Sequence, residues 1–221
     1  MSTITINLFP KGAYPISKIK RDAFEVGSTL GHNLSIKYGH SVTNKSPKLV
    51  AGLGPCVGLT LFTPSDKFVA HSAPELDEPS LVSKFLGKKI HEIREKSRCA
   101  DDEVSAVIYG GIAFDGENPA SEMSCALVDK MEEACRVEGV EPTIITGQYS
   151  NGLTSRLDSY IGNRQITMWS KMFDGVNLSP DATKAEVQKV LEDLFEYVKI
   201  PQQTLLKVLE NLPYKTNHLS K

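Results

Sequence analysis

A cysteine and a histidine stand where two short strands would bring their side chains together. Cys56 follows a Gly-Leu-Gly-Pro turn and precedes an apolar run that is typical of a buried strand. His71 ends the next apolar segment, which begins at Lys67 after a Thr-Pro-Ser-Asp turn. Because two strands joined by a tight turn pair antiparallel, we expect Cys56 and His71 at the same end of the pair. A thiol next to an imidazole can serve as a nucleophile with its general base.

The same two residues also have a purely structural interpretation. A cysteine at this place can be a small buried hydrophobe, and the histidine can be an ordinary residue at a strand end. The glycines of the turn favour the chemical interpretation, because they let the chain bend sharply and bring its backbone near a ligand. If the pair is catalytic, we expect His71 to lower the pKa of the Cys56 thiol by stabilising the thiolate.

The composition is that of an ordinary globular protein. The chain has 221 residues, of which 40% are hydrophobic and 24% are charged, and its formal net charge is −2. This balance offers no broad positive surface for nucleic acid or for an anionic membrane. No apolar stretch approaches the roughly 20 residues of a membrane-spanning helix, and the first nine residues lack the basic start of a secretory signal. We expect no nucleic-acid partner and no membrane association.

The four cysteines stand at positions 56, 99, 125 and 135. No CxxC pair occurs, and the spacings suit neither a zinc site nor a framework of disulfide bonds. Reduced thiols favour a reducing compartment, so we expect a cytoplasmic location. Chemistry performed by a thiol and an imidazole requires no metal and no organic cofactor, and we expect none.

Hydrophobic periodicity and turn residues predict an α+β fold. We expect a mixed or antiparallel β-sheet core of sandwich-like form with flanking helices. The pair Gly110-Gly111 interrupts a predicted strand, which indicates a bulge or a close backbone approach. Helices are predicted over residues 17–30, 80–96 and 118–137. Strands are predicted over residues 2–9, 34–38, 48–53, 57–62, 67–71, 103–114 and 142–146, with a hairpin of 156–161 and 165–169.

The character of the chain changes after residue 172. Residues 181–199 carry helical periodicity, and Pro201 opens a second predicted helix. We therefore expect a domain of residues 1–172 that carries the Cys56–His71 pair, and an extension of residues 173–221 that forms an antiparallel helical hairpin. The hairpin covers the domain or binds a partner.

An acidic, proline-marked segment from 74 to 79 follows His71 directly. Its polar composition predicts an exposed loop beside the candidate site. We expect the carboxylates of Glu75, Asp77 and Glu78 to form a rim that selects a basic surface on a partner protein.

Three short motifs occur in order: Leu53-Gly54-Pro55-Cys56-Val57-Gly58-Leu59, Ala70-His71 and Val107-Ile108-Tyr109-Gly110-Gly111. Together they resemble the family of chemoreceptor glutamine deamidases, CheD. The likeness spans about residues 45–172 and includes the helix, the strand and the closing hairpin that follow the third motif. The Cys–His core is similar to that of the cytotoxic necrotizing factor toxins and of amino-terminal asparagine amidohydrolase. The resemblance implies that Cys56 is the nucleophile and His71 its base.

Two positions depart from the family pattern. Pro55 stands where the family usually has serine, and because proline has no N–H, an oxyanion must be bound by the amides of Cys56, Val57 or another strand. Val50 stands where CheD has a threonine, six residues before the cysteine. The resemblance to the toxins implies that a backbone carbonyl, here that of Val50, orients the imidazole of His71. The expected substrate-binding residues flank the pair: Gly54, Pro55, Val57 and Ser72.

The resemblance implies a cysteine-dependent hydrolase that converts a glutamine side chain of a protein to glutamate through a thioester. An amine that replaces water would give transglutamination as a side activity. The expected partner is a protein substrate, and a toxin-like role would make the chain an effector delivered into a host cell. Two alternatives stay open: an amidase acting on an N-terminal asparagine or a small amide, and a catalytically inactive protein-binding module.

Overall fold

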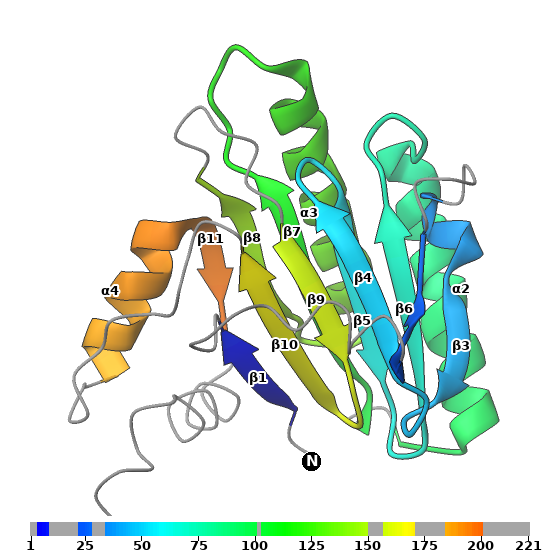
Figure 1. The fold of residues 1–221 in the computed structure, drawn as a ribbon. Coiled ribbons are helices and arrows are strands. Elements are labelled where there is room, and N and C mark those ends of the chain that lie inside the picture. Colours follow the sequence, from blue (N-terminus) through cyan, green and yellow to red (C-terminus); the bar gives the residue numbers. More distant parts are fainter. Residues whose placement is uncertain are drawn as a thin grey trace, which may run out of the picture.

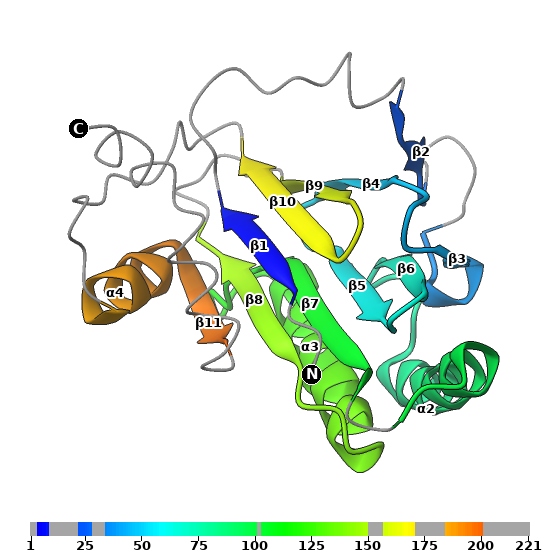
Figure 2. The same ribbon diagram turned by 90° about the horizontal axis from the view of Figure 1, so that it is seen from below.

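Two β-sheets and a pair of helices are stacked in three layers (Figures 1 and 2). The computed structural model describes residues 4–8, 22–27, 34–100, 103–149, 157–170 and 184–200. In Figure 2 the six-stranded sheet lies between the five-stranded sheet and the helices. Both sheets contain parallel and antiparallel pairs, so the described part of the chain is an α+β fold with two mixed sheets, as the sequence predicts.

The five-stranded sheet has the order β1-β10-β9-β4-β2. β9 and β10 form the predicted antiparallel hairpin, and β4 pairs antiparallel with β9. The edge strands β1 and β2 run parallel to their neighbours. The strands of this sheet are β1 (Thr5–Leu8), β2 (Phe24–Glu25), β4 (Lys48–Leu53), β9 (Leu157–Ile161) and β10 (Gln165–Ser170).

The six-stranded sheet has the order β11-β8-β7-β5-β6-β3. β5 pairs antiparallel with both β6 and β7, and β7 runs parallel to β8. β3 and β11 pair antiparallel at the two edges. The strands of this sheet are β3 (His40–Thr43), β5 (Val57–Phe62), β6 (Asp66–Ser72), β7 (Ser105–Ile112), β8 (Thr143–Gln148) and β11 (Phe195–Lys199).

Two long helices, α2 (Pro79–Ser97) and α3 (Pro119–Val137), cover the outer face of the six-stranded sheet. Each begins with a proline in its first turn, where the missing N–H would have no partner within the helix. Asn118 caps α3 by accepting a hydrogen bond from the N–H of Ala120 at 3.0 Å. Both helices therefore begin and end within a few residues of the predicted bounds.

The core has two halves because side chains alternate along each strand. Leu59 of β5 packs toward the helices, whereas Phe62 packs between the sheets. At the end of β6 opposite His71, the fully buried Lys67 donates from Nζ to three carbonyl oxygens. These belong to Asn44 at 2.9 Å, Ile161 at 3.2 Å and Gly162 at 2.6 Å. The lysine thereby closes one end of the space between the sheets.

The N-terminal part of the chain differs from the prediction at two places. Residues 22–27, which fall within the predicted helix of 17–30, contain the short strand β2. Gly27 has a φ of +73°, a left-handed conformation that ends a helix rather than continuing it. Residues 34–38 form no strand, because Ile36–Tyr38 is a short 3-10 helix, η1. The N–H of Ile36 donates to the carboxylate of Asp77 at 2.8 Å, a partner 41 residues away.

The C-terminal helix is shorter than predicted. Helix α4 (Lys184–Leu194) ends midway, and the next five residues form β11 instead of continuing the helix. β11 completes the sheet by pairing with β8, and Phe195 is buried in the core between the sheets. The second predicted helix, from Pro201, lies outside the described residues, so the helical hairpin stays a prediction.

Candidate active site

The loop that carries Cys56 crosses from one sheet to the other. It connects β4 of the five-stranded sheet to β5 of the six-stranded sheet. Gly52 has a φ of +78°, and its N–H donates to Asp158 Oδ1 at 2.7 Å. The N–H of Gly54 then donates to the Gly52 carbonyl at 3.0 Å. These two bonds hold a sharp bend that only residues without bulk can make.

The Gly110-Gly111 pair meets the Cys56 loop from β7. Both glycines have a positive φ, +88° and +72°, and the N–H of Gly111 donates to the Cys56 carbonyl at 2.9 Å. A Cβ at Gly110 would lie 2.9 Å from the Cβ of Leu53 and 3.0 Å from the Cys56 carbonyl oxygen. The close backbone approach that the sequence predicts at this pair is confirmed, and it fixes the main chain of Cys56.

The structure places Cys56 and His71 at the same end of the β5–β6 pair, as predicted. Gly58 is opposite His71 in the register, and Cys56 lies two residues before Gly58. Side chains two residues apart share a face of a sheet. Cys56 accordingly packs against the cluster between the sheets, whereas Val57 packs toward the helices. Diagonal neighbours on one face lie roughly 7–8 Å apart at Cα. Their catalytic roles remain predictions.

His71 is a buried imidazole, and only 2% of its surface is exposed. Gly27 packs directly on it, since a Cβ at Gly27 would lie 2.6 Å from the Cβ of His71. Neither ring nitrogen makes a hydrogen bond of good geometry in the described part of the chain, although the main chain of Val26 lies close enough to act on the ring. Burial lowers the pKa of His71 to about 4, while the nearby main chain of Val26 and the carboxylate of Asp77 act in the opposite direction. The imidazole is therefore neutral at pH 7 and can accept a proton.

Cys56 is half-buried, and its thiol is also neutral at pH 7. Burial raises its pKa to about 11, and the negative charges of Glu75 and Asp77 act in the same direction. The expectation that His71 lowers this pKa is wrong for the resting structure, because a buried neutral imidazole supplies no positive charge. The structure holds a neutral thiol and a neutral base rather than a thiolate–imidazolium ion pair.

The acidic loop is only partly the rim that the sequence predicts. Glu75 and Glu78 are exposed, but Asp77 is buried with 6% of its surface exposed. The Asp77 carboxylate accepts hydrogen bonds from the Ser35 hydroxyl at 2.5 Å, the Ile36 N–H at 2.8 Å and the Ser72 hydroxyl at 2.6 Å. It therefore ties the loop to the end of β6 and to η1, and it is unavailable to a partner.

The remaining predicted site residues fall into different environments. Val50 is fully buried in β4, and the main chain that acts on the pKa of His71 is that of Val26, so the orienting role of Val50 stays a prediction. Ser72 is fully buried, follows His71 and donates its hydroxyl to Asp77, which places it on the helix side of β6, away from the imidazole. Gly54 and Pro55 are half-buried in the loop. The N–H of Cys56 donates to no acceptor among the described residues, so it can bind an oxyanion.

Two parts of the site were missed from the sequence. Val26 and Gly27 come from a segment for which a helix is predicted, although the glycine itself is the signal against that helix. Asp158, which holds the bend at Gly52, lies 106 residues away in β9, and no local pattern marks it.

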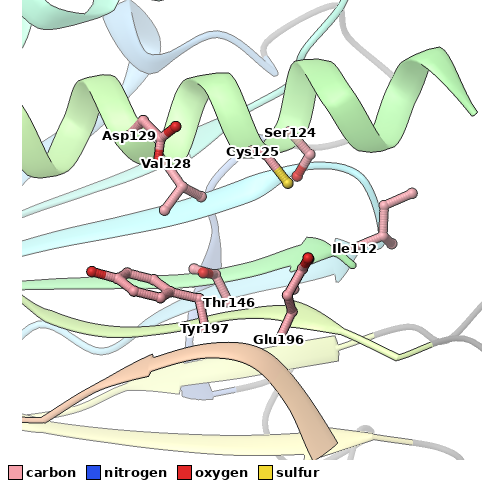
Figure 3. A pocket seen from close by; sticks show the side chains of 9 residues that line it. Ile112, Ser124, Cys125, Val128, Asp129, Thr146, Glu196 and Tyr197 are labelled. Carbon is pink, nitrogen blue, oxygen red and sulfur yellow. The ribbon is translucent and has the colours of Figure 1, made fainter. Parts of the chain in front are cut away.

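A hollow lies on the helix side of the six-stranded sheet, between α3 and the edge formed by β8 and β11 (Figure 3). Its volume is about 220 Å³. Among the described residues, no three His, Cys, Asp or Glu side chains are grouped so as to hold a metal ion, and no helix is long and apolar enough to cross a membrane.

Comparison with known proteins gives no family for this chain. No protein-family model matches it, and no curated protein matches it by sequence. The function therefore has to be argued from the site.

Proposed function

We propose that this protein is a cysteine-dependent deamidase that hydrolyses the side-chain amide of a glutamine in a protein substrate. The observation that carries the proposal is a buried imidazole, without a hydrogen bond of good geometry at either nitrogen, on the same sheet face and at the same strand end as a half-buried cysteine. Buried polar groups are nearly always hydrogen-bonded, so an unsatisfied one requires an explanation such as catalysis.

In the proposed first step, Cys56 Sγ attacks the carbonyl carbon of the carboxamide while its proton moves to His71. The C–S bond forms, the C=O π electrons move to oxygen, and the N–H of Cys56 donates to that oxyanion. His71 then gives its proton to the amide nitrogen, the C–N bond breaks, and ammonia leaves a thioester behind.

In the second step, water attacks the thioester as His71 accepts one of its protons. Collapse of this second tetrahedral intermediate breaks the C–S bond, and the proton returns to the thiolate. The product is a glutamate side chain, and the neutral Cys56–His71 pair is restored. Since both groups are neutral at rest, no thiolate is present before the reaction begins. The imidazole acts as a general base that removes the thiol proton during the attack.

The exposed residues beside the pair support a macromolecular substrate. Glu75 and Leu76 protrude from the loop after β6, and 53% of the Leu76 surface is exposed. An apolar side chain next to a carboxylate suits a protein surface with basic residues near the target glutamine. The resemblance to CheD and the necrotizing factor toxins points to the same substrate class.

The test compares Cys56→Ser with the matched control Cys99→Ser, since both cysteines are half-buried. Candidate protein fractions are incubated with each variant and with the parent. Mass spectrometry then looks for conversion of glutamine to glutamate, and a coupled assay measures ammonia. We expect conversion by the parent and by Cys99→Ser, and none by a folded Cys56→Ser. Conversion by Cys56→Ser would remove the proposed nucleophile. Conversion of free glutamine, asparagine or N-terminal asparagine peptides alone would favour the small-amide amidase.

A further inference from the structure

The hollow beside α3 has walls from four elements that are distant in the sequence. α3 forms one wall, and β7, β8 and the edge strand β11 form the floor and the other wall (Figure 3). Its volume of about 220 Å³ is below the range of roughly 300–1,000 Å³ that drug-sized ligands occupy. The lining residues are Ile112, Ser124, Cys125, Val128, Asp129, Thr146, Gly147, Glu196 and Tyr197.

Two carboxylates face this hollow from opposite walls. Asp129 lies on α3 and Glu196 on β11, and the lining contains no lysine, arginine or histidine. The pKa of the Cys125 thiol is raised mainly by burial and, to a smaller extent, by the negative charges of Glu196 and Asp129. Both carboxylates are therefore close enough to act on this thiol. Both residues are exposed, so the two carboxylates stand at the solvent-facing edge of the hollow, and Lys130 next to Asp129 lies outside the lining.

Glu196 is held in place over the hollow. Its Oε2 accepts a hydrogen bond from the N–H of Phe114 at 2.6 Å. Gly147, with a φ of +73°, makes room for it, since a Cβ there would lie 2.7 Å from the Cβ of Glu196. In Figure 3 the Glu196 carboxylate is directed toward Ser124 and Cys125. A carboxylate fixed in this way binds a ligand at a small loss of conformational entropy.

Two buried hydroxyls also face the hollow. Ser124 and Thr146 have 1% and 2% of their surface exposed, and both line the hollow, so what remains accessible of these two residues faces it. They can accept hydrogen bonds from a donor that enters between the carboxylates.

The rest of the lining is apolar. Ile112 and Val128 contribute aliphatic surface, and the ring of Tyr197 is held by its hydroxyl, which donates to Glu132 at 3.0 Å. A bare divalent cation needs several oxygen ligands at about 2.0–2.6 Å, whereas no metal-binding group of three carboxylate, thiol or imidazole side chains occurs in the part of the chain that the structure describes. An ammonium group with a short hydrocarbon tail matches both the charge and the apolar surface.

We propose that the hollow between α3, β8 and β11 is a binding site for a small primary amine in its ammonium form. The ammonium lies between Asp129 and Glu196 and donates its remaining hydrogen to the hydroxyl of Ser124 or Thr146. The alkyl part packs on Ile112. This site is separate from the Cys56–His71 pair and does not depend on the function proposed for that pair.

The test uses n-butylamine as the probe, followed by the amide NMR signals of the full ¹⁵N-labelled chain near neutral pH. We expect saturable shifts at Thr146, Gly147 and Glu196. 1-Butanol has the same hydrocarbon chain without the charge, and its affinity should be lower than that of n-butylamine by a factor of about five or more. Butyrate should not bind. n-Butylamine should also slow the alkylation of Cys125 by iodoacetamide. Equal binding of n-butylamine and 1-butanol, or shifts that do not map to the lining, would overturn the proposal.

Variants distinguish the effect of the two lining carboxylates on binding from the effect of surface charge in general. Asp129→Asn and Glu196→Gln should each weaken n-butylamine binding about fivefold or more. Glu133→Gln removes a carboxylate from the same helix outside the lining and should leave the affinity unchanged. If Glu196→Gln disturbs β11, as the Tyr197 amide signal would report, Asp129→Asn decides. Equal affinities of Asp129→Asn and Glu133→Gln would refute the site.

Discussion

The pH at which Cys56 becomes reactive is the most direct test of the neutral pair. At pH 7 a thiol of pKa about 11 is ionised in about one molecule in ten thousand, against about one in a hundred for the ordinary value of 9.0. A thiolate of higher pKa is intrinsically more nucleophilic, which recovers about tenfold over two pKa units. The net deficit in alkylation rate at pH 7 is therefore only about tenfold, so the midpoint of the pH profile is the sharper observable.

The assay treats the native protein with iodoacetamide from pH 6 to the highest pH at which the fold survives, as circular dichroism reports. Peptide mapping by mass spectrometry follows each cysteine separately. We expect the Cys56 rate to rise about tenfold per pH unit with a midpoint near 11. Glu75→Gln should lower the midpoint, because the Glu75 charge raises the pKa of this thiol.

His71→Gln distinguishes the neutral pair from an ion pair. If both groups are neutral at rest, replacing the imidazole removes no positive charge, and the Cys56 midpoint should stay nearly unchanged. A midpoint below about 8 in the parent that rises in His71→Gln would show a resting thiolate–imidazolium pair. That result would refute the reasoning from burial and would restore the expectation drawn from the sequence.

Two further predictions concern stability. Asp77→Ala should lower the free energy of unfolding by about 3–5 kcal/mol, because it leaves two hydroxyls and one N–H without their carboxylate. The exposed control Glu75→Ala should change it by less than about 0.5 kcal/mol in urea denaturation, and equal effects would contradict a buried anchor. Stability should also fall as the pH drops from 6.5 to 4, because the unfolded chain takes up a proton at His71 that the folded chain excludes. The pKa difference corresponds to about 3 kcal/mol, and His71→Gln should remove this part of the pH dependence; parallel curves for variant and parent would count against a buried neutral imidazole.

The predictable parts of the fold are those whose signals are local. β5 is buried along its whole length, and its continuous apolar run marks it as a strand. The apolar stripes of α2 and α3 mark both helices, the Asn118 cap marks the start of α3, and a tight Gly-Asn turn marks the β9–β10 hairpin. The cap predicted at Ser80 is wrong, because α2 begins at Pro79 with Glu78 at its N-cap. The relative position of Cys56 and His71 follows from such local signals alone, because a tight turn fixes the register of the pair.

The unpredicted parts depend on partners far along the chain. The sequence of residues 195–199 continues the helical pattern of α4. In the structure these residues instead form hydrogen bonds with the edge of β8, a strand that is distant in the sequence and therefore invisible to a local pattern. Asp77 has the local composition of an exposed loop, yet its carboxylate is buried by partners 41 and 42 residues away. The pKa values of Cys56 and His71 depend on burial between two sheets, and that burial is a property of the assembled fold.

The neutral pair changes which group carries most of the catalysis in the proposed mechanism. A preformed thiolate would store its activation in the resting enzyme, whereas a neutral thiol with a weak base develops charge only as the carbonyl is attacked. The stabilisation must then come from groups aimed at the oxyanion, which is where preorganised N–H donors contribute most. Pro55 removes one such donor from the loop. The N–H of Cys56 has no acceptor among the described residues, and the carbonyl of the same residue is held by the Gly111 N–H. The Cys56 N–H is therefore the donor on which the proposed reaction depends.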